Sequence, residues 1–225
     1  TAADVDTGDT VTITCTTVPT WMNCASRALT GTAVNANVSA HSVVITASDG
    51  TASVTDSFTV TVANTNDAPT ISSTAVTAVD EDAAYSYTVT TADVDVGDTV
   101  TLTGTTVPSW MTFTASSGAL TGTPTNSEVG SHSVVITASD GTVSVTDTFT
   151  VVVSNTNDAP TISSTAVTAA TEDAAYSYTT TAADVDTGDT VTITCTTVPT
   201  WMTCASGALT GTPVNANVGA HSVVI

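Results

Sequence analysis

Residues 134–153 read VVITASDGTVSVTDTFTVVV. Apolar side chains recur at every second position from Val134 to Ala138, and a second alternation runs from Val143 to Val153. Between the two runs lies Asp140-Gly141, a pair typical of tight turns. Apolar residues at every second position with threonine between them indicate strands that bury one face. The stretch therefore predicts an antiparallel hairpin with a threonine-rich outer face.

The same alternation extends through the rest of this repeat. Tyr85, Tyr87 and Val89 alternate with serine and threonine, and Val100 and Leu102 alternate with threonine. Helix signals are absent, and Gly, Asp, Asn and Pro separate the apolar runs. About seven such runs in a repeat of roughly 90 residues are typical of an immunoglobulin-like β-sandwich. The predicted fold class is therefore all-β, with antiparallel strands.

Copies of this repeat follow one another along the chain. The recurring segments are DVDVGD (93–98), with counterparts at 4–9 and 184–189; VPSWM (107–111), with counterparts at 18–22 and 198–202; and NDAP at 66–69 and 157–160. They divide the chain into a partial domain at 1–66, a complete domain at 67–157 and a partial domain at 158–225. The NDAP segments are then joints between domains, and the proline restricts how far each joint bends.

The sequence also repeats at a longer period than that of a single domain. Residues 1–45 match residues 181–225 at all positions except Asn23/Thr203, Arg27/Gly207, Ala33/Pro213 and Ser39/Gly219, whereas the middle repeat differs from both. The repeating unit is thus a pair of unlike domains. We interpret the chain as a window of a much longer repetitive polypeptide.

Acidic residues dominate the charge of the chain. It has 21 Asp and Glu residues but only one basic residue, Arg27, so the formal net charge is -20. Such a chain cannot neutralise a row of phosphates, which argues against nucleic-acid binding and against an anionic membrane surface. Apolar residues make up 41% of the chain, which is not the profile of a disordered acidic tail. No apolar run is long enough to span a membrane.

Cysteines occur in two of the three repeats. Cys15 and Cys24 lie in the first repeat and Cys195 and Cys204 in the third, whereas the middle repeat has Gly104 and Phe113 at these positions. Cysteines that are present or absent together are most simply paired, and a Gly–Phe pair could fill the same space. Two disulfides within domains are therefore expected, which implies an oxidising compartment. Four free buried thiols are the alternative; a zinc site is disfavoured because each repeat supplies only two sulfur atoms.

The acids gather in the recurring motifs rather than over the whole surface. In an extended chain Asp93 and Asp95 point to the same side, roughly 7 Å apart. Two such carboxylates can flank or bridge hard cations, and calcium accepts six to eight oxygen ligands in irregular geometry. The alternative interpretation is that these Asp side chains accept hydrogen bonds from turn amides.

Taken together, these motifs resemble known repeats. The Asp-x-Asp-x-Gly-Asp segment, the ASDG turn (138–141), the NDAP joint and an early Glu-Asp pair are similar to the calcium motifs of cadherin repeats. VPSWM followed by GALTGTP resembles the dystroglycan-type cadherin-like and immunoglobulin-like repeats of large microbial surface proteins. The resemblance covers the whole chain and implies calcium ions held at the joints between domains.

The resemblance also implies a ligand set for each joint. It points to Asn66, Asp67, Asp93, Asp95 and Asp140 at the first joint, and to Glu81 or Asp82, Asn157, Asp158, Asp184 and Asp186 at the second. The chain departs from cadherins in three ways. Asn64 and Asn155 stand where a cadherin joint begins with Asp, Ala68 and Ala159 stand where it ends with Asn, and the mid-domain Asp-Arg-Glu motif is missing. Fewer or weaker calcium ions than in a cadherin junction are therefore expected.

Other polar residues receive structural interpretations. His41, His132 and His221 occupy one equivalent position at a strand start, where a structural role is expected. Asp56 and Asp147 lie on the apolar side of their strands, which predicts a bulge or a buried turn contact. Asn37-Val-Ser39 is a single N-glycosylation sequon.

The expected function is structural. The chain is interpreted as a repeat segment of an extracellular filament or adhesin stalk, stiffened by calcium at its joints and by disulfides, and contacting neighbouring repeats, other copies or glycans. The alternative is a cell-adhesion or carbohydrate-binding module, for which Trp21, Trp110 and Trp201 are the only candidate aromatic platform. An enzyme is disfavoured because every motif recurs in each repeat, whereas a catalytic site normally breaks such symmetry.

Overall fold

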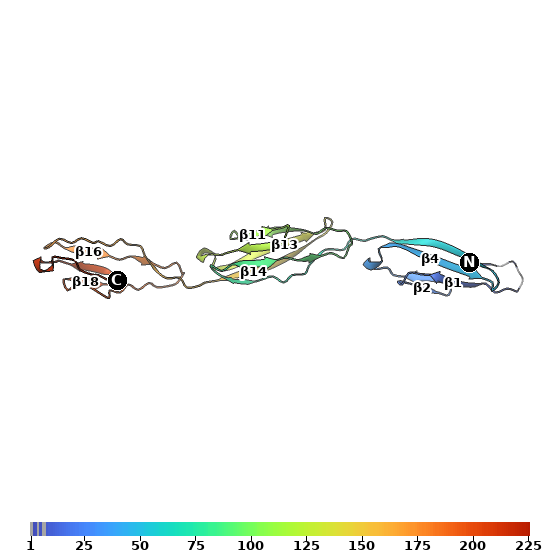
Figure 1. Cartoon of the computed structure of the whole chain (residues 1–225), viewed down its shortest axis with the longest axis horizontal. Helices are drawn as coiled ribbons and strands as arrows, with labels where there is room; N and C mark the ends of the chain where they lie inside the picture. Colours follow the sequence, from blue (N-terminus) through green and yellow to red (C-terminus); the bar gives the residue numbers. More distant parts are fainter. Residues whose placement is uncertain (1, 4, 6–7) are drawn as a thin grey trace.

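Three β-domains follow one another in an extended row, with the N-terminus in the domain at one end and the C-terminus in the domain at the other (Figure 1). The computed structural model describes residues 2–3, 5 and 8–225, so the copy of the acidic motif at 4–9 falls partly outside it. These described residues contain no α-helix; their helical turns are η1 (Asn35–Asn37), η2 (Asn126–Glu128) and η3 (Asn215–Asn217). No helix in this part of the chain is long and apolar enough to cross a membrane. The predicted all-β class is confirmed.

The middle domain contains the complete repeat. Its strands are β6 (Thr70–Ile71), β7 (Ala78–Asp80), β8 (Tyr85–Thr88), β9 (Thr91–Ala92), β10 (Thr101–Thr106), β11 (Met111–Thr114), β12 (Ala119–Gly122), β13 (Gly130–Ser139) and β14 (Ser144–Ser154). They form one sheet in the order β10-β13-β14-β7, a second in the order β11-β12-β8, and the short pair β6-β9. The hairpin predicted from residues 134–153 is β13–β14. The pairing of β7 with β14 is parallel and is the exception to the antiparallel expectation.

Apolar side chains from both sheets form the core of the middle domain. The buried cluster consists of Tyr85, Tyr87, Val89, Met111, Leu120, Val134, Ile136 and Val151. Tyr87 meets Phe149 edge to face, with ring centroids 5.6 Å apart. The predicted alternation thus places the same side chains on the inner face, where removal of their apolar surface from water stabilises the domain.

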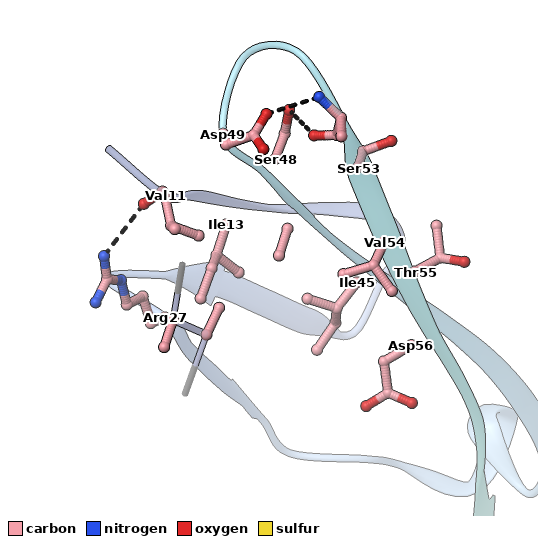
Figure 2. Close-up of a pocket in the computed structure, with 14 residues that line it drawn as sticks. Val11, Ile13, Arg27, Ile45, Ser48, Asp49, Ser53, Val54, Thr55 and Asp56 are labelled. Atoms are coloured by element: carbon pink, nitrogen blue, oxygen red, sulfur yellow. Dashed lines mark hydrogen bonds between the residues drawn. The ribbon is translucent and has the colours of Figure 1, made fainter. Parts of the chain in front are cut away.

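The first domain repeats the later strands of this arrangement. Its strands are β1 (Thr12–Thr17), β2 (Met22–Ala25), β3 (Ala28–Gly31), β4 (Ser39–Ser48) and β5 (Ser53–Val62), in the sheets β1-β4-β5 and β2-β3. The inner face of the larger sheet opens into a hollow lined by Ile13, Ile45 and Val54 (Figure 2). In the middle domain the corresponding face packs against Tyr85 and Tyr87 of β8. The hollow is therefore an uncovered part of the core face.

The bulge expected at the inward-facing acids is wrong. Asp56 pairs with Ile45 and Asp147 pairs with Ile136, each in an unbroken one-to-one register along the whole hairpin. A bulge needs one extra residue on one strand, and neither of these registers skips a residue. The register shifts instead in the β1–β4 and β10–β13 pairs.

The third domain repeats the earlier strands. They are β15 (Thr161–Ile162), β16 (Tyr176–Thr179), β17 (Ala182–Ala183), β18 (Met202–Ala205) and β19 (Ala208–Gly211). β16-β19-β18 form one sheet and β15-β17 a second pair. An isolated antiparallel bridge joins Thr197 and Val224.

Both expected disulfides are present, Cys15–Cys24 and Cys195–Cys204, and no cysteine is free. The first joins β1 of one sheet to β2 of the other. In the middle domain Gly104 and Phe113 take these places. A Cβ added at Gly104 would lie 3.0 Å from Cδ1 of Phe113, so the ring occupies this space between the sheets.

Candidate interdomain metal centres

The linker aspartate of each joint is bound by both of the domains that flank it. The Asp158 backbone N–H donates to Asp186 Oδ2 of the third domain (2.7 Å), and its Oδ2 accepts from Asn126 Nδ2 of the middle domain (2.5 Å). At the first joint Asp67 makes the matching bonds, to Asp95 Oδ2 (2.6 Å) and from Asn35 Nδ2 (2.6 Å). Both joints thus have one local geometry, built from turns and loops that the repeat supplies twice.

Three acids from separate segments converge at the second joint. Carboxylate oxygens of Glu81, Asp158 and Asp186 lie within 4.8 Å of one another, and they come from the middle domain, the linker and the third domain. Glu81 is only 2% exposed, and its Oε1 accepts from the Thr156 backbone N–H (2.6 Å). The neighbouring Asp82 is exposed, has φ 59° in the turn after β7 and lies outside the cluster. Of the two residues predicted as alternatives, the structure brings Glu81 to the joint.

The two Asp-x-Asp-x-Gly-Asp loops that the structure describes in full form a second kind of acidic cluster. Oxygens of Asp93, Asp95 and Asp98 lie within 4.8 Å of one another, as do those of Asp184, Asp186 and Asp189. The loop is closed by bonds from the Asp95 N–H to Asp93 Oδ1 and from the Asp186 N–H to Asp184 Oδ1, both 2.9 Å. Asp186 belongs to both clusters of the second joint. Asp98 and Asp189 were not in the predicted ligand set, although their place in the recurring motif was a signal for them.

The two oxygens of each buried carboxylate have different surroundings. One oxygen accepts a backbone hydrogen bond, as the turn interpretation predicts. The other, at Glu81 Oε2, Asp93 Oδ2, Asp95 Oδ1 and Asp186 Oδ1, is buried and has no hydrogen-bond partner among the described residues. A buried carboxylate oxygen without a partner is costly, so these oxygens are suited to a cation.

No basic side chain compensates this charge. The guanidinium of Arg27, the only Lys or Arg side chain of the protein, donates to the Val11 carbonyl oxygen in the first domain, at 3.5 Å (Figure 2). Two carboxylates whose charges lie within 4.8 Å of each other repel by at least about 3.5 kcal/mol at an effective dielectric constant of about 20. The clusters therefore favour a divalent cation on electrostatic grounds as well.

Asp140 connects a hairpin turn to the first joint. Its Oδ1 accepts from the backbone N–H groups of Thr142 and Val143, and its Oδ2 accepts from Asn66 Nδ2 (3.0 Å). The Val143 N–H, the Asn66 amide and the Thr142 N–H, in this order, hold the pKa of Asp140 below its ordinary range. At the second joint Asn157 Nδ2 donates to the Asp158 carbonyl oxygen (2.7 Å).

Sequence reasoning missed Asn35 and Asn126. Each is the first residue of a 3-10 turn in the domain before the joint, at the ends of η1 and η2 that meet the linker aspartates. The signal was present, because asparagine occupies this position in all three repeats, including Asn215.

The three histidines have the structural role expected of them. Nε2 of His41, His132 and His221 lies 2.5–2.7 Å from the carbonyl oxygen of the residue that ends the preceding 3-10 turn. Each ring meets a tryptophan edge to face at 5.7–6.0 Å. The tryptophans are half-buried by these contacts, and Trp110 and Trp201 also pack against tyrosines, so they do not form an exposed aromatic platform.

Fold and site together define a tandem array of immunoglobulin-like β-domains with acidic joints. The chain belongs to the family described as "Putative Ig domain", whose sequence model matches residues 1–63, 68–154 and 159–225. No curated protein sequence matches the chain.

Several solved structures are similar to the chain. PcdhgB3 EC1-4 is 17% identical with a TM-score of 0.56, over 94% of this chain and 59% of that one. Protocadherin gamma B7 extracellular cadherin domains 1-4 are 17% identical with a TM-score of 0.49, over 93% and 64%. The endo-fucoidan hydrolase MfFcnA4 from glycoside hydrolase family 107 is 26% identical with a TM-score of 0.37, over 94% and 36%. The chain thus spans 36–64% of the length of these structures. The likeness to PcdhgB3 EC1-4 confirms the predicted cadherin-like fold.

Proposed function

We propose that the chain is a structural segment of an extracellular filament or adhesin stalk, in which calcium at the joints stiffens a row of domains. The main support is the convergence of Glu81, Asp158 and Asp186 from three separate segments. A cation that contacts all three carboxylates ties the middle domain, the linker and the third domain together. Its binding therefore restricts bending of the joint, and the partners of the segment are neighbouring repeats of the same kind.

The chemistry of the donor set favours calcium. All the converging side chains are carboxylates, and the linker adds amide and carbonyl oxygens but no sulfur or imidazole. Calcium takes six to eight such oxygens at about 2.3–2.6 Å in flexible geometry, whereas magnesium requires a near-octahedral site and gives up its water reluctantly.

Both joints offer a cluster of several acids. At the second joint Asp186 is shared by two clusters, so two neighbouring ions with Asp186 as the bridging ligand fit the five carboxylates. At the first joint the loop cluster of Asp93, Asp95 and Asp98 lies next to Asp67, whose backbone N–H donates to Asp95 Oδ2. We expect both joints to bind calcium.

The disulfides fit the same role. Each closes a loop with a sequence separation of nine residues, and Cys15–Cys24 connects the two sheets of the first domain, which resists shearing of these sheets under load. Disulfides persist in oxidising compartments, which supports an extracellular location.

The test is a comparison of the 225-residue chain in chelator, in calcium and in magnesium. Small-angle scattering is expected to show a longer particle with calcium than in chelator, because stiff joints prevent the chain from folding back on itself. The melting temperature is expected to rise with calcium, because a ligand that binds only the folded state stabilises it. Equal dimensions and equal melting temperatures in chelator and in calcium would contradict the proposal.

A further inference from the structure

We propose that Asn126, and Asn35 at the first joint, position the linker aspartate through a link that needs no cation. We call the bonds from Asn126 Nδ2 to Asp158 Oδ2 and from Asn35 Nδ2 to Asp67 Oδ2 the amide links. The inference deepens the proposed stiffening of the joints, on which it rests for its biological purpose, but the geometry of the links is independent of calcium.

The amide link occurs twice in different sequence surroundings. The turn is Asn-Ala-Asn at η1 and Asn-Ser-Glu at η2, yet the amide nitrogen lies 2.6 Å and 2.5 Å from the linker aspartate. Only the first residue is common to both turns, and it is the residue that donates. The link therefore follows from Asn at this position rather than from the rest of the turn.

The turn that carries Asn126 is fixed to the domain on its inner side. Its last residue, Glu128, accepts through Oε2 from the Thr125 N–H (2.9 Å), which closes the turn. The Glu128 carbonyl oxygen lies 2.5 Å from Nε2 of His132, whose ring packs on Trp110, and Trp110 in turn packs on Tyr85 of the core. Asn126 is thus held at the end of a chain of contacts that begins in the core.

On its outer side the link continues into the next domain. The backbone N–H of Asp158 donates to Asp186 Oδ2, and Asp186 is 5% exposed in the third domain. The contacts Asn126–Asp158–Asp186 connect two domains through hydrogen bonds alone, and one partner in each bond is a carboxylate, which strengthens it. The joint therefore has a preset geometry before any cation binds.

An amide suits this position better than a carboxylate. It orients Asp158 without adding a fourth negative charge to Glu81, Asp158 and Asp186. A carboxylate at position 126 would meet the Asp158 carboxylate at close range, and in the absence of a cation the two charges would repel each other.

The test uses Asn126→Leu, which removes the donor at nearly constant size, and Asn215→Leu as the matched control. Asn215 occupies the same place in η3, is exposed, and its side-chain amide donates to no aspartate among the described residues. Residual dipolar couplings of the 225-residue chain, measured in chelator, report whether the middle and third domains align as one body. Asn126→Leu is expected to lower the alignment of the third domain relative to the middle domain, and Asn215→Leu is expected to leave it as in the wild type. Unchanged amide shifts of Val134 and Ile136 verify that the middle domain is folded.

A second variant, Asn126→Asp, is expected to loosen the chelated joint at least as much as Asn126→Leu. If both variants align as the wild type does in chelator, the amide link is overturned, whatever calcium does. If the wild type does not bind calcium but Asn126→Leu still loosens the joint, the calcium proposal fails while the amide link is supported. The two failures are thus distinguishable.

Discussion

Glu81 and Asp186 belong to different domains, yet their carboxylate oxygens lie within 4.8 Å of each other and both side chains are buried. The contact shows that the net charge of -20 is distributed unevenly along the chain. The acids are concentrated where one domain meets the next, while the outward positions of the sheets carry mostly serine and threonine. We therefore expect the chain to respond to divalent cations at its joints.

Glu81→Gln is expected to weaken calcium binding at the second joint about tenfold, or about 1.4 kcal/mol, because one charged ligand is replaced by a neutral one. Glu172→Gln is the matched control, since Glu172 occupies the equivalent place in the third domain but is exposed and lies outside the acidic clusters found in the described chain. Isothermal titration calorimetry measures both. Equal affinities of Glu81→Gln and the wild type would remove Glu81 from the ligand set.

The middle domain has Gly104 and Phe113 at the positions of the disulfide of the third domain. The third domain is expected to tolerate the same Gly–Phe pair. Cys195→Ala with Cys204→Ala is expected to cost about 3 kcal/mol, from the entropy of the nine-residue loop that the bond closes. Cys195→Gly with Cys204→Phe is expected to recover part of this loss, because the ring fills the space between the sheets as Phe113 does. Hydrogen exchange of amides in β18 and β19 measures the stability of this domain separately. If the amides of the Gly–Phe variant are no more protected than those of the Ala–Ala variant, a Gly–Phe pair does not replace the disulfide in this domain.

Arg27→Gly is expected to stabilise the first domain by about 1 kcal/mol, because the left-handed backbone is costly for a residue with a Cβ. Arg27 has φ 67°, and the same place is taken by Gly118 (φ 69°) and Gly207 (φ 78°) in the other repeats. The variant also removes the long 3.5 Å contact to Val11, which is a small loss. Thermal unfolding monitored by amide exchange in β2 and β3 gives the comparison. Asn23→Thr, another difference between the first and third repeats, lies within β2 and is expected to change stability by less than about 0.5 kcal/mol.

The parts of the structure that depend on a repeating pattern could be predicted from the sequence. Period-two alternation placed Tyr85 and Tyr87 in the core, and the joint presence of the cysteines gave their pairing. Contacts between residues of different segments, such as a turn and a linker, could not be predicted in this way. Asn126 meets Asp158 only because a turn of one domain folds against the linker that follows the last strand.

The choice between Glu81 and Asp82 shows a second limit. Both are acids at adjacent positions, and only the left-handed backbone of Asp82 and the burial of Glu81 decide which of them reaches the joint. The wrong expectation of a bulge at Asp147 has a related origin. An acid on the apolar side of a strand indicates an irregularity, but the one-to-one pairing of β13 with β14 overrides it.

Alkaline pH is expected to destabilise the middle domain through Tyr85. Burial, and secondly the neighbouring Tyr87, raise the pKa of Tyr85 to about 12, while its hydroxyl donates to the Val76 carbonyl oxygen (2.8 Å). The pKa of an unfolded tyrosine is about 10, so the folded state favours the neutral form. The contribution of Tyr85 to stability is therefore complete below about pH 10 and is lost as the pH rises toward about 12. Absorbance of tyrosinate at 295 nm, followed together with circular dichroism, is expected to show a late phase that coincides with loss of structure. Tyr85→Phe is expected to reduce that phase to the part that belongs to Tyr176, whose pKa is also raised by burial. A late phase of the same size in the variant would assign it to another residue.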